Sequence, residues 1–210
     1  PALMKPVSDL SGTIQLTKNI INVPDVSCRI GQSTLSLTAQ VKNFLSLAPE
    51  MPAQPGQPAI VLPKQGKAVI TFALNSPLLD LDEMLPPLPK PGEVRPTEAQ
   101  VAPVMPPLPD FLLDGKVRIA KVRFLKIDYH NLAGNLTMNN RKMELDGQVG
   151  IYSGKILGGL WADLKDLANI EYRLKAKASQ LEANDFLSAL TSFKDRMFTK
   201  LDLDGEFSGL

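Results

Sequence analysis

Residues 10–16 read Leu-Ser-Gly-Thr-Ile-Gln-Leu, and residues 132–138 read Leu-Ala-Gly-Asn-Leu-Thr-Met, the same pattern 122 positions later. In both stretches apolar residues alternate with polar ones, which places the two kinds of side chain on opposite faces of a β-strand. The alternation recurs near 69–75, 116–119, 143–146 and 172–177, and glycine and Asn-Asn turns separate the runs. The sequence therefore predicts a mainly β fold of repeated antiparallel strands.

The alternating runs belong to an internal repeat. Ile70, Phe72 and Leu74 correspond to Tyr172, Leu174 and Ala176 at an offset of 102, and residues 79–85 continue the match as 181–187. A third match, 113–115 with 203–205, predicts that a further unit begins near residue 203. Units with one apolar side need neighbours that continue that side. We therefore expect a curved, groove-like sheet with short helices.

Proline divides the chain into parts. Fifteen of the 18 prolines lie between residues 49 and 109, and proline does not fit inside a sheet. We expect a first β unit over 1–85 with a Pro-rich insert at about 46–66. A Pro-rich linker over 86–109 and a second β unit over 110–210 follow. The spacing of Phe186, Leu187, Leu190, Phe193 and Met197 predicts an amphipathic helix over 184–198, and a shorter counterpart begins at Asp82.

Composition argues against several functional classes. The formal net charge is +1, so no overall field steers the chain to nucleic acid. One cysteine, Cys28, and one histidine, His130, exclude an intramolecular disulfide and the usual multi-His metal sites. His130 lies two residues from Asp128, but no nucleophile or oxyanion site accompanies them. We therefore expect no cofactor, no metal and no enzymatic activity.

The duplicated motifs resemble the C-terminal region of AsmA-like proteins. Residues 132–138 match its L-x-G-x-L strand, and residues 151–159 (Ile-Tyr-Ser-Gly-Lys-Ile-Leu-Gly-Gly) are similar to its Y-G-G-x-x-x-G turn, with Ser153 in place of the first glycine. Residues 178–187 and 76–85 are two copies of a further family segment. The resemblance implies a piece of a longer periplasmic protein of a diderm bacterium, tethered to the inner membrane by an N-terminal helix and involved in outer-membrane biogenesis. Larger relatives are thought to carry phospholipid along an apolar β groove.

Inward apolar residues of the predicted strands are the candidates for a lipid-binding groove. The alternative is an ordinary sheet core covered by the 184–198 helix. The candidates are Ile14, Leu16, Ile70, Phe72, Leu74, Val117, Ile119, Leu136, Met138, Leu145, Tyr172 and Leu174.

Basic residues at alternate positions are weaker candidates for lipid headgroup contacts, since the solvated face of a strand is the favoured explanation for them. They are Lys116, Arg118, Lys121 and Arg123, and a second set comprises Arg173, Lys175 and Lys177. Gly158-Gly159 reads as part of a turn, and the neighbouring Trp161 as a core anchor or a groove wall. Asp80 and Asp82 read as solvated residues at a strand end.

The sequence thus predicts a non-enzymatic module that binds or conducts phospholipid acyl chains. Its alternative function is a scaffold that assists outer-membrane protein assembly, offering strand edges or Pro-rich loops to a partner. An open apolar face favours lipid, and a face filled by the helix favours the scaffold.

Overall fold

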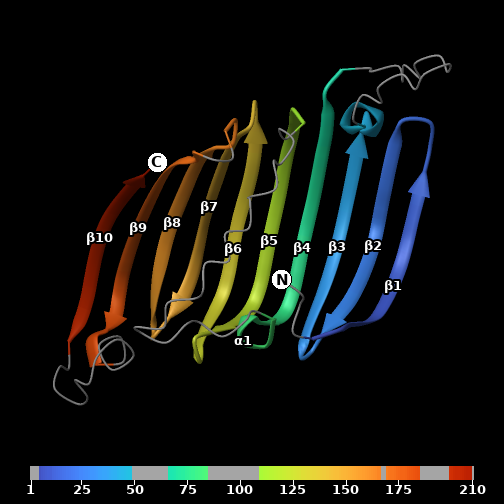
Figure 1. Ribbon diagram of the computed structural model, residues 1–210. Helices are drawn as coiled ribbons and strands as arrows, with labels where there is room; N and C mark the ends of the chain where they lie inside the picture. Colours follow the sequence, from blue (N-terminus) through green and yellow to red (C-terminus); the bar gives the residue numbers. More distant parts are fainter. Residues whose placement is uncertain (1–4, 49–65, 85–108, 167–168, 185–198, 210) are drawn as a thin grey trace, which may run out of the picture.

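The computed structural model describes residues 5–48, 66–84, 109–166, 169–184 and 199–209. These residues form one open ten-stranded sheet whose strands lie side by side in chain order (Figure 1). The strands are β1 (Val7–Leu16), β2 (Ile20–Ile30), β3 (Ser33–Lys42), β4 (Ala68–Asp80), β5 (Phe111–Phe124), β6 (Ile127–Asn139), β7 (Lys142–Ile151), β8 (Gly154–Asp163), β9 (Glu171–Glu182) and β10 (Lys200–Gly209). The prediction of a mainly β fold is confirmed.

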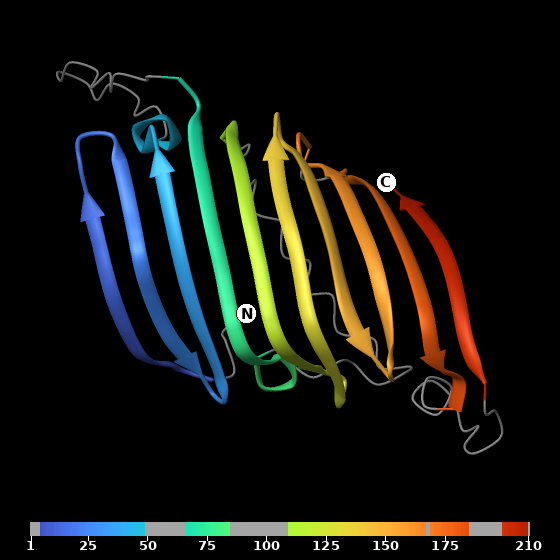
Figure 2. The ribbon, with the colours of Figure 1, turned by 180° about the vertical axis from the view of Figure 1, so that it is seen from behind.

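Two short helical segments lie at the ends of strands. The 3-10 turn η1 (Phe44–Leu47) follows β3, and α1 (Leu81–Met84) follows β4, where the sequence predicts a short helix. Seen from the front and from behind, the described strands and helices form a single layer (Figures 1 and 2). The predicted 184–198 helix is described only at residue 184, which is helical; residues 185–198 and nearly all of the two Pro-rich stretches lie outside the described residues. The groove-like curvature stays a prediction.

Strand pairing is antiparallel except between β4 and β5, which run parallel, so the prediction of antiparallel strands is wrong for this pair. The reason lies in the connection. Thirty residues, 81–110, separate the two strands. β4 has 13 residues and spans about 43 Å at about 3.3 Å per residue, so the connection is long enough to return the chain to the end where β4 begins.

Two-residue turns make four of the antiparallel connections, and in three of them both central residues have positive φ. Leu125–Lys126, Asn140–Arg141 and Tyr152–Ser153 all have φ between 45° and 62°. Positive φ at both central residues is typical of the type I′ turn, whose twist matches the flanking strands. The turn between β7 and β8 is therefore Tyr152–Ser153, and the reading of Gly158-Gly159 as part of a turn is wrong, because both glycines lie inside β8.

The repeat is visible in the backbone. β1 and β6 carry the first match, and each contains one non-glycine residue with positive φ, Asp9 and Asn131, 122 positions apart. Each lies at a register shift in the pairing with the next strand. Short polar residues such as Asp and Asn tolerate this conformation, which fits a β-bulge. The two units thus share a local irregularity as well as a sequence pattern.

A small core lies where several strands end together. Ile151, Ala178 and Leu181 are buried, and Ile127 and Tyr129 from the β5–β6 hairpin pack against them. Ile156 of β8 and Leu201 of β10 complete the cluster. This packing joins the ends of strands β6, β7, β8, β9 and β10, and the middle of the sheet lies outside it.

Candidate functional site: the apolar face of the sheet

Residues paired across neighbouring strands point to the same face, so the strand register identifies what each face carries. One face carries three rows that cross the sheet; we call it the apolar face. The first row is Val23, Ala39, Phe72, Gly115, Leu136, Leu145, Leu160, Leu174 and Phe207. The second is Leu16, Ile21, Val41, Ile70, Leu113, Met138, Met143, Ala162, Tyr172 and Gly209. The third is Gly12, Val26, Leu37, Leu74, Val117, Gly134, Gly147, Gly158, Ala176 and Gly205.

Large apolar side chains on this face are exposed to solvent. Leu145, Leu174 and Tyr172 are 37%, 39% and 41% exposed, and Phe207 and Leu16 are 64% and 68% exposed. Large contiguous apolar surface is uncommon on soluble proteins and marks a contact surface. The face is therefore the strongest candidate site in the described part of the chain.

The twelve groove candidates all lie on the apolar face. Ten of them are members of the three rows. Ile14 lies two residues before Leu16, and Ile119 lies two residues after Val117, so the strand period places both on the same side. The sequence analysis missed the contributions of β2, β3 and β8, such as Ile21, Val41 and Leu160.

Two of the four basic headgroup candidates, Lys116 and Arg118, lie on the opposite face, and the other two are engaged in ion pairs. Lys116 and Arg118 alternate with the apolar residues of β5 and point to the opposite, polar face, in register with Ala73 and Asn75 of β4. Lys121 Nζ lies 2.7 Å from Asp128 Oδ2. Arg123 contacts the carboxylates of Asp80 at 3.3 Å and Asp128 at 3.1 Å. The last two candidates therefore serve as ion-pair partners inside the sheet.

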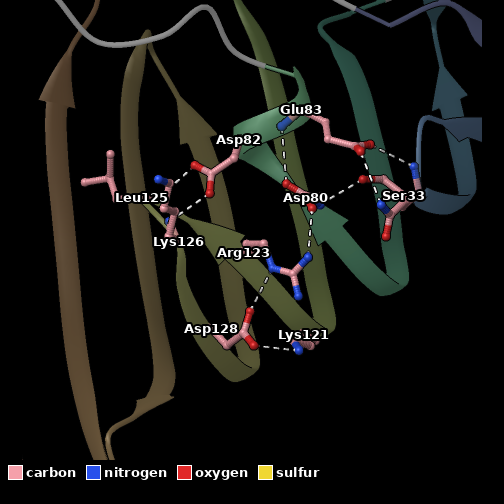
Figure 3. Close-up of polar contacts among 10 residues, drawn as sticks. Ser33, Asp80, Asp82, Glu83, Lys121, Arg123, Leu125, Lys126 and Asp128 are labelled. Carbon is pink, nitrogen blue, oxygen red and sulfur yellow. Dashed lines mark hydrogen bonds and ion pairs between the residues drawn. The ribbon is translucent and has the colours of Figure 1, made fainter. Parts of the chain in front are cut away.

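A polar cluster around α1 holds one end of the sheet together (Figure 3). Asp80 is 3% exposed, so the expectation of a solvated strand end is wrong for this residue. Its backbone N–H donates to Ser33 Oγ at 2.8 Å, and its carboxylate accepts from the Glu83 N–H at 3.2 Å. Arg123 supplies the opposite charge, which a buried carboxylate requires.

The acidic residues of α1 bind two hairpin turns. Asp82 accepts hydrogen bonds from the N–H groups of Leu125 and Lys126 at 2.7 and 2.8 Å (Figure 3). Glu83 accepts from the Gln32 N–H at 3.1 Å. The four residues of α1 therefore connect the β2–β3 turn to the β5–β6 turn, across β4.

Ion pairing and burial shift three pKa values nearby. The Lys121 ammonium, followed by the Arg123 guanidinium, lowers the pKa of Asp128 through hydrogen bonds. The pKa of Arg123 is raised by its hydrogen bond to Asp128. Burial, with a contribution from the charge of Asp82, raises the pKa of Tyr129. Asp128 is thus held as a carboxylate by two cations and does not form a dyad with His130, which is exposed on β6.

The polar face carries the single tryptophan. Trp161 is in register with Glu144 and Arg173, on the side opposite the apolar rows, so it is neither a wall of the apolar face nor a core anchor. The Arg173 guanidinium lies 5.3 Å and the Lys142 ammonium 5.8 Å from the ring centroid, within cation–π range.

Among the described residues, no group of three or more His, Cys, Asp or Glu side chains is arranged to hold a metal ion. No helix in the described ranges is long and apolar enough to cross a membrane. Comparisons with protein-family models, with curated proteins and with solved structures find no match.

Proposed function

We propose that this chain binds phospholipid acyl chains on its apolar face, as a non-enzymatic module of an AsmA-like protein in the periplasm of a diderm bacterium. The proposal is supported by the continuity of the three apolar rows and by the exposure of their large side chains on β7, β9 and β10, although Met138 and Ala162 of the second row are buried. An acyl chain needs only contiguous apolar surface, and these rows supply it across the width of the sheet. The AsmA-like motifs of the sequence supply the envelope context.

The magnitude of the effect supports lipid as the occupant. Fully burying a Leu or Phe side chain contributes about 1.5–3 kcal/mol. Leu145, Leu174 and Phe207 are 37%, 39% and 64% exposed, so covering what remains of them contributes about 2–4 kcal/mol together. Each methylene of the ligand buried in the process adds about 0.8 kcal/mol. One row therefore offers enough free energy to hold part of an acyl chain.

A scaffold that offers strand edges is the second candidate. All ten residues of β1 are exposed, and its outer edge has no partner strand in the described part of the chain. Such an edge can take up a strand from another protein by β-augmentation. This function uses backbone groups of β1 and leaves the apolar rows unoccupied, so the two candidates are separable by experiment.

The test uses adjacent residues on opposite faces of β10. The purified chain is incubated with phospholipid vesicles, re-isolated and analysed by native mass spectrometry, alongside Phe207→Asp and Ser208→Asp. Phe207 is in the first apolar row and Ser208 points to the polar face, so the two variants add the same charge one residue apart. We expect bound phospholipid on the wild type and Ser208→Asp, and at least about tenfold less on Phe207→Asp.

Circular dichroism controls for folding, since the 64% exposure of Phe207 lets the sheet form without it. A wild-type chain that carries no phospholipid after incubation would refute the lipid proposal and favour the scaffold. An equal loss of bound phospholipid in Phe207→Asp and Ser208→Asp would show that the added charge, and not the apolar row, governs binding.

A further inference from the structure

A hollow of about 630 Å³ lies on the polar face, centred on Gly159 in the middle of β8. Gly159 is in register with Asp146 of β7 and Lys175 of β9. Leu157 precedes and Trp161 follows this position along β8, each two residues away on the same face. The glycine thus forms the floor, and side chains of three strands form the walls.

The two long walls carry opposite charge. Glu144 and Asp146 line the β7 side, and the β9 side presents Arg173, Lys175 and Lys177, with Asp204 of β10 beyond them. β7 and β9 are separated by β8, so their backbones are about 10 Å apart. Because Gly159 has no side chain, only the Asp146 carboxylate reaches into the space between the acidic and the basic wall at this level.

The walls do not neutralise each other. The basic wall has other partners: Arg173 pairs with Glu171 of the same strand at 3.2 Å, and Lys175 pairs with Glu206 of β10 at 3.4 Å, both in exposed contacts. Among the described residues, no ion pair joins Glu144 or Asp146 to the basic wall. Exposed pairs of this kind contribute little to stability and are readily exchanged for a ligand.

The floor is open only because residue 159 is glycine. A Cβ built there would lie 2.9 Å from Asp146 Oδ1, so the carboxylate reaches over the glycine. Trp161 closes one end of the hollow, and two cations already lie near its ring, 5.3 and 5.8 Å from the centroid. The Trp161 end of the hollow therefore already holds Lys142 and, from the basic wall, Arg173, which leaves the acidic side for a ligand cation.

We propose that this hollow binds a small zwitterion, a molecule that carries an ammonium group and a phosphate or carboxylate. The ammonium faces Glu144 and Asp146, and the anionic group faces Arg173, Lys175 and Lys177. A simple anion or a simple cation satisfies one wall and is repelled by the other, so the charge arrangement selects for the zwitterion. The site lies on the face opposite the apolar rows and does not depend on acyl-chain binding.

Trp161 is the only tryptophan of the chain, so its fluorescence reports directly on the hollow. The full chain is titrated with O-phosphoethanolamine, with inorganic phosphate and with ethanolamine at low ionic strength. We expect a saturable change in Trp161 fluorescence with O-phosphoethanolamine. The affinities for phosphate and for ethanolamine should be lower by at least about tenfold. Phosphate that binds as tightly as O-phosphoethanolamine would reduce the site to an anion site and overturn the proposal.

Two variants test the geometry. Gly159→Leu fills the floor, and the only close neighbour of its Cβ is the movable end of Asp146, so the strand should form normally. Ala133→Leu is the control, because it adds the same bulk on the polar face outside the hollow. We expect at least about tenfold weaker binding of O-phosphoethanolamine in Gly159→Leu and no change in Ala133→Leu. Unchanged binding in both variants would place the ligand elsewhere and refute the site.

The charge requirement and the source of the zwitterion need two further arms. Asp146→Asn should lower the affinity for O-phosphoethanolamine to that for phosphate. Unchanged affinity for O-phosphoethanolamine in this variant would overturn the role of the acidic wall. Phosphatidylethanolamine vesicles are then compared with phosphatidylglycerol vesicles. A Gly159-dependent signal with the former alone identifies a lipid headgroup, and a signal limited to soluble O-phosphoethanolamine identifies a free zwitterion. If neither probe binds, the proposal fails while the Phe207 test of acyl binding stands.

Discussion

Asp82 stabilises a hairpin turn that is strained on its own. The turn between β5 and β6 consists of Leu125 and Lys126, with φ of 55° and 61°. The left-handed region costs a non-glycine residue about 1–2 kcal/mol. The Asp82 carboxylate accepts from both turn N–H groups, at 2.7 and 2.8 Å, and thereby stabilises the conformation. Asp82→Ala removes both hydrogen bonds and leaves the strain.

The expected magnitude follows from these contacts. A hydrogen bond contributes about 1 kcal/mol net, and the N–H groups of both turn residues can donate to water when the carboxylate is lost. We therefore expect Asp82→Ala to lower the free energy of unfolding by about 2 kcal/mol. Lys126→Gly relieves about 1–2 kcal/mol of strain at one position, but the freer unfolded chain offsets about 0.4–1 kcal/mol of it. The substitution should therefore raise the free energy of unfolding by about 1 kcal/mol. The double variant should be intermediate.

Urea unfolding followed by far-UV circular dichroism and Trp161 fluorescence measures these changes as shifts of the midpoint. Asp114→Ala is the control, because Asp114 is an exposed strand residue for which the described part of the chain shows no ion pair or hydrogen bond. Coincident midpoints for Asp82→Ala and Asp114→Ala would refute the argument that α1 stabilises the turn.

Two further predictions concern packing and acid stability. The Phe72 ring occupies the space where a side chain at Gly115 would begin, so Gly115→Val should lower the free energy of unfolding, measured by thermal unfolding, by about 1–3 kcal/mol. Adding Phe72→Ala to this variant should recover part of the lost stability. A Gly115→Val variant as stable as the wild type would contradict this contact. Because Lys121 and Arg123 lower the pKa of Asp128, the ion pairs add stability above the ordinary carboxyl pKa of about 4, and this stability is lost as the pH falls through the lower pKa of the folded state. Asp128→Asn should therefore be less stable than the wild type near neutral pH and approach it below about pH 3, and a constant difference across that range would contradict the assignment.

The alternation of apolar and polar residues predicted which face a side chain lies on better than it predicted which segments form strands. It identified the faces of β1, β4, β5, β6, β7 and β9, and the structure places every groove candidate on one face. It missed β2, where Pro24 and Asp25 interrupt the pattern at a register shift between Val23 and Val26. It also missed β8, because Gly158 and Gly159 carry no side chain to mark a face and resemble a turn.

Other features depended on contacts that no local pattern encodes. Asp80 alternates like a surface residue, but Ser33 and Arg123, 47 and 43 positions away in sequence, meet it at the sheet end. By contrast, the position of Lys116 could have been predicted. It directly precedes Val117 in one strand, and neighbouring strand residues point to opposite faces. A headgroup contact from Lys116 to a lipid on the apolar face was therefore inconsistent with the same alternation that defined the groove.

The parallel pair also explains where the repeat ends. Ile70, Phe72 and Leu74 lie in the same apolar rows as their counterparts Tyr172, Leu174 and Ala176, so this match is structural. Leu113 and Leu203 also match in sequence, but Leu113 pairs with Ile70 in the second row, whereas Leu203 pairs with Ala178 outside the three rows.

The cause is strand direction. β5 runs parallel to β4, and β10 runs antiparallel to β9, so equal sequences enter the sheet from opposite ends. Reversal of a strand keeps the alternation of faces but changes which residue joins which row. The apolar face is therefore continuous through both units even though the repeat is not, because continuity requires only that each strand keep one apolar side.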